Sequence, residues 1–156
     1  MDTTEAALAA LREGIALARR HGVPLVAVRA WALGLPRHGG RRLRHVVHRY
    51  VVLSFSGVEQ RSAAAELTQQ AMRAAAGSIP GDIDLLIETP AGDPAVALTA
   101  TASHPGDVLV VGHRHALTAR GAVHGSVTAY CLRHARCPVV VVPPDGPACT
   151  VPFVAA

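Results

Sequence analysis

DVLVVG at residues 107–112 and CPVVVV at residues 137–142 are two short runs in which nearly every side chain is apolar. Valine-rich runs of this length are typical of strands that are buried on both faces of a sheet. Between them, Ser126–Ala135 has the composition of an amphipathic helix. Apolar strands that alternate with helices predict a doubly wound α/β domain with a mostly parallel sheet and right-handed crossovers.

The same alternation continues from these runs toward the N-terminus. Residues 92–94 are Gly-Asp-Pro, which predicts a helix start with Asp93 as the cap and Pro94 in the first helical position. Gly22 and Gly77 follow helical patterns and predict helix ends. The pattern predicts further helices over residues 2–21, 58–76 and 95–103, and further strands over residues 23–31, 50–55 and 83–89.

The composition narrows the class of protein. The chain has 156 residues, of which 50% are hydrophobic, and this suits one domain with a sizeable core. All 15 basic residues are arginine, so chemistry that needs a lysine, such as a Schiff base, is excluded. Aromatic residues make up 3% of the chain, which leaves almost no stacking platform for single-stranded nucleic acid.

Charge, cysteine content and the first residues predict a protein of the cytoplasm. The formal net charge of +4 gives weak attraction to polyanions but does not by itself indicate a nucleic-acid function. Cys131, Cys137 and Cys149 lack CxxC spacing, so neither a disulfide framework nor a zinc site is predicted. The first residues carry acids and no continuous apolar run, which argues against a signal peptide, and no stretch has the length of a membrane span.

The segment between the two apolar runs carries the strongest candidate for a binding site. A predicted strand ends at Gly112, a loop follows over residues 113–124, and Gly125-Ser126 opens a helix. Glycines let backbone amides approach phosphates closely, and a helix N-terminus adds unpaired N–H groups. The site also lies at the carboxyl end of a strand, where open α/β sheets bind ligands. An anion cradle and an ordinary capped helix both fit this pattern.

These residues resemble the universal stress protein family. In that family the corresponding strand ends in Gly-x2-Gly-x9-Gly-Ser/Thr, followed by a helix and a strand that begins Cys-Pro-Val. The chain matches this pattern at Gly112, Gly125 and Ser126, and its segment LRHARCPV, Leu132–Val139, resembles the family's closing segment. The resemblance covers residues 2–32 and 58–143, including Leu25–Trp31 and the turn at residues 92–95.

The resemblance implies a stress-response module that binds ATP through an adenine pocket and this glycine loop. The residues it places at the ligand are Gly112, Gly125, Ser126 and Val127 for phosphates and ribose, and Ala30 for adenine. His115 belongs to the same site and stands where the family has its second glycine, so its side chain would occupy phosphate space or force a different loop shape. The resemblance also implies a homodimer, since the family's last strand commonly pairs with that of a second copy.

A second departure from the family concerns the start of the chain. The resemblance implies a five-stranded sheet in the order 3-2-1-4-5, whose central first strand ends in an acidic residue. Aligning the first helix places Asp2 at that position, so the first strand is expected to be missing. Either the true start lies upstream, or another segment fills the gap. The strand-like tail CTVPFVA at residues 149–155 is a candidate, although Pro152 would remove one ladder donor and favours an edge position.

We therefore expect a universal stress protein-like domain over residues 1–145, with a basic insert at 37–57, and a tail over 146–156 that can add a strand. The alternative function is a nucleotide-independent interaction protein that binds acidic partners through residues 37–49, which contain five arginines and no acid. Nucleic-acid recognition is disfavoured because no aromatic interleaving or DNA-binding motif accompanies these charges.

No catalytic set and no metal site is predicted. Ser126 does not lie in a Gly-x-Ser-x-Gly elbow, and Cys131 and Cys137 fit buried packing positions. The nine histidines lack the spacing of zinc ligands and are predicted to be exposed loop residues. The other interpretation is an altered anion site in which His113, Arg114, His115, Arg120 and His124 face phosphates. Any ATP hydrolysis is expected to be slow and incidental.

Overall fold

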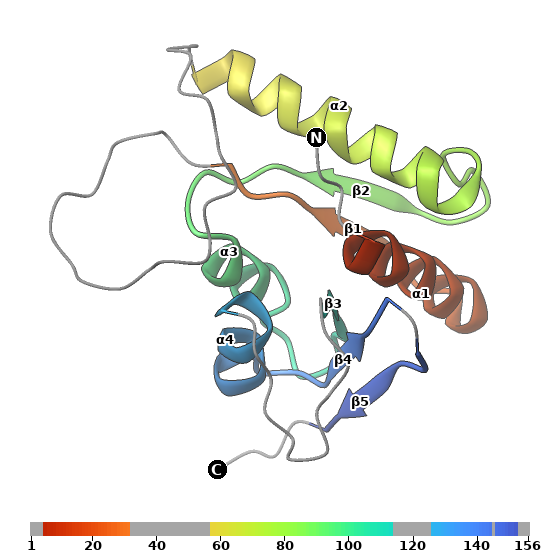
Figure 1. The fold of residues 1–156 in the computed structure, drawn as a ribbon, viewed down its shortest axis with the longest axis vertical. Coiled ribbons are helices and arrows are strands. Elements are labelled where there is room, and N and C mark those ends of the chain that lie inside the picture. The colour runs from red at the N-terminus through yellow and green to blue at the C-terminus, as the bar shows by residue number, and fades with distance from the viewer. Residues whose placement is uncertain (1–4, 32–56, 114–125, 145, 153–156) are drawn as a thin grey trace, which may run out of the picture.

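The computed structural model describes residues 5–31, 57–113, 126–144 and 146–152 (Figure 1). The helices in these ranges are α1 Glu5–His21, α2 Gly57–Ala76, α3 Pro94–Thr101 and α4 Ser126–His134. The strands are β1 Leu25–Val28, β2 Leu85–Glu88, β3 Leu109–Gly112, β4 Val139–Val142 and β5 Cys149–Val151. The predicted α/β class is confirmed, whereas the strand predicted over residues 50–55 lies outside the described residues.

The described strands form two sheets, whereas the sequence predicted one five-stranded sheet. β1 pairs in parallel with β2, and β3 pairs in parallel with β4. These are the neighbours that the implied order 3-2-1-4-5 requires for its strands 2 and 3 and its strands 4 and 5. β5 pairs antiparallel with β4 at the outer edge of the second sheet. Within the described ranges no strand lies between β1 and β3, and the order as a whole stays a prediction.

Helix α1 lies between the two sheets and packs against both (Figure 1). On one side, Ile15 packs with Ala27 of β1 and Met72 of α2 in a first core. On the other side, Ala6 in the first turn lies directly against Gly112 at the end of β3. Two sides of α1 therefore join two sheets whose described strands share no ladder hydrogen bonds with each other.

A second core lies between the sheet β3-β4-β5 and the helices α3 and α4. Its buried side chains are Leu109, Val111, Cys131, Cys137, Val139 and Val141. Because side chains alternate along a strand, Val140 and Val142 face the opposite side of the sheet, where α1 packs, and they are buried as well. Burial on both faces explains why β3 and β4 are apolar at nearly every position.

Local sequence signals place the ends of the helices. The Asp93 carboxylate accepts hydrogen bonds from the N–H groups of Ala95 at 2.8 Å and Val96 at 3.3 Å, so the predicted cap of α3 is confirmed. Gly22 and Gly77 end α1 and α2 with φ angles of 62° and 78°, a region that glycine enters without steric cost. None of the described helices is both long and apolar enough to cross a membrane.

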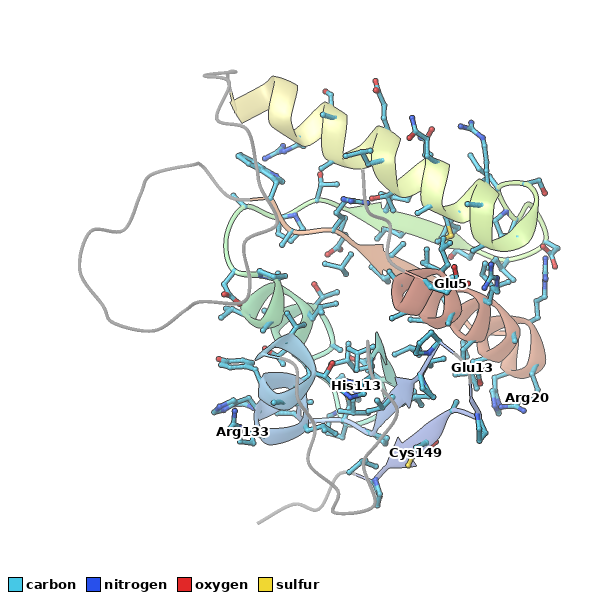
Figure 2. All side chains as sticks on the ribbon, in the orientation of Figure 1. Glu5, Glu13, Arg20, His113, Arg133 and Cys149 are labelled. Carbon is cyan, nitrogen blue, oxygen red and sulfur yellow. The ribbon has the colours of Figure 1, made fainter. Side chains whose placement is uncertain are left out.

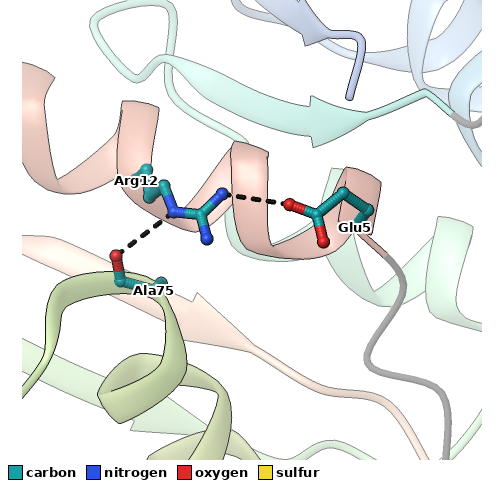
Figure 3. Close-up of polar contacts among 3 residues, drawn as sticks. All are labelled: Glu5, Arg12 and Ala75. Atoms are coloured by element: carbon teal, nitrogen blue, oxygen red, sulfur yellow. Dashed lines mark hydrogen bonds and ion pairs between the residues drawn. The ribbon is translucent and has the colours of Figure 1, made fainter. Parts of the chain in front are cut away.

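Two arginines on the exposed side of α1 make polar contacts. Arg12 donates from Nε to the carbonyl oxygen of Ala75 at 3.3 Å, and its Nη1 pairs with Glu5 at 3.3 Å (Figure 3). Arg19 donates from Nη2 to Asp82 Oδ1 at 2.9 Å, and this hydrogen bond lowers the pKa of the Asp82 carboxyl. Exposed ion pairs contribute little to stability, so these contacts are a minor part of what holds α1 in place.

Gly112→Ala is expected to destabilise the protein, because a Cβ at this position would overlap the Ala6 carbonyl oxygen. Overpacking of this kind costs about 1–3 kcal/mol of unfolding free energy. Gly81→Ala is the matched control, since its Cβ would meet nothing within 4 Å. Urea unfolding followed by circular dichroism compares the two variants with the unsubstituted protein. Equal midpoints for Gly112→Ala and Gly81→Ala would contradict the close packing of α1 on β3.

The cysteines are expected to differ in reactivity. Burial raises the pKa of the Cys131 thiol to about 11 and also raises that of Cys137, whereas Cys149 is exposed. At about pH 8, a disulfide reagent should label Cys149 in the native protein and the other two only after unfolding. Rapid labelling of a second thiol in the native protein would contradict the burial of Cys131 and Cys137.

The raised pKa of Cys131 also predicts a dependence of stability on pH. The Cys131 thiolate forms more readily in the unfolded chain, so the free energy of unfolding should fall as the pH rises from 9.0 toward about 11.

Candidate functional site

The candidate site lies where β3 ends and α4 begins, at the carboxyl edge of the second sheet. The structure describes the chain up to His113 and again from Ser126. A hydrogen bond joins the end of β3 to the start of α4, because Thr128 Oγ1 in the first turn of α4 donates to the carbonyl oxygen of Gly112 at 3.2 Å. Val127 packs against the second core beside this bond. Gly112, Ser126 and Val127 therefore meet at one edge of the sheet.

Helix α4 directs its N-terminal end toward this edge. Its first turn contains no acidic residue, and its last turn carries Arg133 and His134. The N–H groups of a first helical turn have no partners within the helix, and with the helix dipole they form a positive end. No carboxylate within that turn competes for these groups. This end of α4 can therefore accept an anionic group such as a phosphate.

Gly112 has a packing role that the sequence did not indicate. The space that a side chain would take is filled by the backbone of Ala6. The hydrogen bonds from Leu109 N–H to Pro138 and from His113 N–H to Val142 show that Leu109 in β3 and His113 just after it point their main chain at β4. The carbonyl of Gly112 therefore points away from β4, and Thr128 satisfies it. A contact between Gly112 and a phosphate stays a prediction.

His113 is buried, with 2% of its surface exposed (Figure 2). Its backbone N–H donates to the Val142 carbonyl at 2.8 Å and extends the ladder one residue beyond β3. The expectation that the histidines are exposed loop residues is therefore wrong for this one. The alternation of side chains along a strand could have predicted that His113 is buried. Leu109, Val111 and His113 occupy alternate positions, and the first two belong to the second core.

Ala30, the residue implied for the adenine site, follows β1 in the first sheet. The neighbouring N–H groups of Arg29 and Trp31 donate to the carbonyls of Glu88 at 2.9 Å and Pro90 at 3.0 Å. By the alternation of a parallel ladder, the main-chain groups of Ala30 point away from β2. The Trp31 side chain anchors this segment by donating from Nε1 to Thr89 O at 2.8 Å. Ala30 is thus held at the carboxyl end of a strand, as Gly112 is.

Several predicted residues lie outside the described residues. They are Asp2, His115 and Gly125, the loop residues Arg114, Arg120 and His124, and the basic segment 37–49. Among the residues that are described, no three His, Cys, Asp or Glu side chains gather in a way that could hold a metal ion.

Comparison with known proteins identifies the family of this chain and relatives with the same fold. A model of the universal stress protein family matches residues 1–143 of the chain. No curated protein matches it in sequence. Among solved structures, the universal stress protein UspA from Lactobacillus plantarum is 21% identical with a TM-score of 0.58, and 91% of this chain and 92% of that one are covered.

Two further structures share the fold. A universal stress protein in complex with cAMP is 21% identical with a TM-score of 0.57, and 93% of each chain is covered. The universal stress protein from Archaeoglobus fulgidus is 15% identical with a TM-score of 0.56, over 91% of this chain and 92% of that one. At this level of identity the structures establish the fold, and the family model establishes the relationship. The chain belongs to the universal stress protein family.

Proposed function

We propose that this protein is a stress-response module that binds an adenine nucleotide at the edge formed by β3, α4 and the residues between them. One observation carries the proposal: in a chain of this family, the Thr128–Gly112 hydrogen bond fixes the N-terminus of α4 at the carboxyl end of β3. This is where open α/β sheets bind ligands, and where a positive helix end suits a phosphate.

The similar structure that contains cAMP supports an adenine nucleotide as the ligand. cAMP carries an adenine and a single negative charge on its phosphate, whereas ATP carries a longer and more highly charged phosphate chain. In the proposed arrangement the main chain of Ala30 meets the adenine, and Gly125, Ser126 and Val127 meet the phosphate and ribose. The main-chain groups of Ala30 suit this role because they point away from β2.

His115 is the residue by which this site departs from the family pattern. Its imidazole takes the place of a glycine, so it removes room for a phosphate and supplies a side chain that can donate to one. In the proposal, His115 limits the length of the phosphate chain that the loop accepts. ATP is the ligand with which the binding of other adenine nucleotides is compared.

The proposed protein acts in the cytoplasm as a homodimer and needs no catalytic set. Binding alone changes its state, because a ligand shifts the population toward the conformer it binds more tightly. The alternative is a nucleotide-independent interaction protein that uses residues 37–49 to bind acidic partners. Titration with nucleotide separates these two functions.

We expect a fluorescent ATP analogue to bind with micromolar affinity and to be displaced by unlabelled ATP and by cAMP. Gly125→Val should weaken binding by about tenfold or more, because its side chain blocks the approach of phosphate to backbone amides, and a hydrogen bond to a charged group is worth about 1.5–3 kcal/mol. Gly81→Val is the matched control, since Gly81 precedes β2 and its Cβ would meet nothing within 4 Å.

A third variant, His115→Gly, restores the family pattern and should change the affinity ratio between ATP and cAMP. An unchanged ratio would remove His115 from the site while leaving nucleotide binding intact. No binding at millimolar ATP or cAMP would contradict the proposed function and favour the alternative. Equal losses in Gly125→Val and Gly81→Val would show that the effect is on folding.

A further inference from the structure

A cavity of about 240 Å³ lies between the last turn of α4 and the ladder that β5 forms with β4. One wall belongs to the second core and consists of Cys137 and Val139, which are both buried. A second wall comes from the tail and consists of Val151 and Pro152, which are both exposed. Since an engineered apolar cavity of about 150 Å³ binds benzene, this cavity has room for a molecule with about six to eight carbon atoms.

The cavity is separate from the proposed nucleotide site. β3 and β4 run parallel, and Gly112 at the nucleotide site lies opposite Val142, the last residue of β4. Val139 is the first residue of β4, so the cavity lies toward the amino end of this sheet. The family model ends at residue 143, so the wall that Val151 and Pro152 form lies beyond the part of the chain that matches the family. A ligand in this cavity therefore adds a function to nucleotide binding.

The third wall, formed by Leu132, Arg133 and Ala135 at the end of α4, offers hydrogen-bond acceptors. The last carbonyl groups of a helix have no partners within the helix. Ala135 N–H donates to the Cys131 carbonyl at 2.8 Å, and among the described residues no later N–H continues this series to Leu132 or Arg133. Main-chain oxygen atoms at the end of α4 are therefore available to a ligand that donates.

The charged end of Arg133 lies away from the cavity. Its Nε donates to the Ala129 carbonyl at 3.1 Å, so the guanidinium lies back along α4 (Figure 2). Arg133 is also two residues from Cys131, which belongs to the second core, and at about 100° per residue the two side chains lie on opposite sides of the helix. Arg133 therefore meets the cavity with its main chain. Its charge and that of Arg136 disfavour a cation at this end of α4.

We propose that this cavity binds a small neutral alcohol, whose apolar part lies against Val139 and Val151 and whose hydroxyl donates to a carbonyl at the end of α4. A hydroxyl supplies the donor that these oxygen atoms accept, whereas a ketone or a carboxylate offers acceptors alone. The apolar part is recognised through burial, because 40% of the surface of Val151 is exposed and a ligand would remove part of it from water. The inference does not depend on nucleotide binding.

The test is a titration of the full-length protein with 1-hexanol, followed by NMR of the side-chain methyl groups. We expect saturable shifts at Leu132, Val139 and Val151, with a Kd in about the millimolar range. Leu86 reports on nonspecific contact, because it is 53% exposed and lies outside the cavity. Its methyl groups should not shift.

Two further ligands test the two parts of the alcohol. 1-Butanol lacks two methylene groups and should bind about tenfold more weakly than 1-hexanol. 2-Hexanone is neutral and has the same number of carbon atoms, but it has no donor. It should bind about threefold to tenfold more weakly than 1-hexanol, which is the effect of one hydrogen bond.

Two variants locate the site. Ala135→Leu fills the cavity and should abolish saturable binding, whereas Ala76→Leu makes the same change at the exposed end of α2 and should leave the Kd within about twofold. Val151→Ser removes apolar surface from the tail without adding bulk and should weaken binding by about fivefold. Its control is Val96→Ser, because Val96 is also exposed and lies outside the cavity.

Several results would overturn the inference. Equal Kd values in Val151→Ser and Val96→Ser, or in Ala135→Leu and Ala76→Leu, would place the alcohol elsewhere. Binding of 2-hexanone or hexylammonium as tight as that of 1-hexanol would exclude the neutral alcohol as the ligand class. Phe153 follows Pro152 in the sequence, so binding seen only in Phe153→Ala would mean that the chain itself fills the cavity. No saturable shift up to the solubility of 1-hexanol in either protein would leave no ligand site, and the nucleotide proposal would stand.

Discussion

The contact between the backbone of Ala6 and Gly112 is the constraint on which the arrangement of the two sheets depends. No hydrogen bond of a ladder joins β1 to β3, so their relative position is set by what packs on both. Helix α1 does this with residues nine positions apart, Ala6 against β3 and Ile15 against β1, which places them about 13 Å apart along its axis. Only a residue without a side chain lets the first turn approach β3 so closely.

The same glycine links the fold to the candidate site. One face of Gly112 receives α1, and its carbonyl, directed away from β4, receives Thr128 of α4. A helix on each side of the sheet is thus fixed to the last residue of β3. The end of β3 and the first turn of α4 thus form one rigid part of the proposed binding edge. In open α/β domains ligands bind at the carboxyl ends of the strands, which a rigid scaffold of this kind positions.

Much of this fold could be predicted because its signals are local. The cap at Asp93, the turns at Gly22 and Gly77, and the apolar runs of β3 and β4 follow from short stretches of sequence, and the structure confirms each of them. What could not be predicted is long-range: that α1 bridges two sheets, that Thr128 meets Gly112, and that β4 is the strand with which the strand-like tail pairs at the edge of the sheet. The burial of His113 is an intermediate case. It was not predicted, but it follows if the alternation of buried side chains in β3 is continued one residue past Gly112.

The two edges of the second sheet are covered by different parts of the chain in the described residues. At the side of β3 away from β4, α1 and the Thr128 hydroxyl cover the strand. At the side of β4 away from β3, a segment beyond the family pattern covers it, and proline ends that segment. Nucleotide binding is proposed at the carboxyl ends of the strands, whereas β5 pairs along the flank of β4. The tail therefore meets the sheet at a different edge from the one that Gly112 and α4 form.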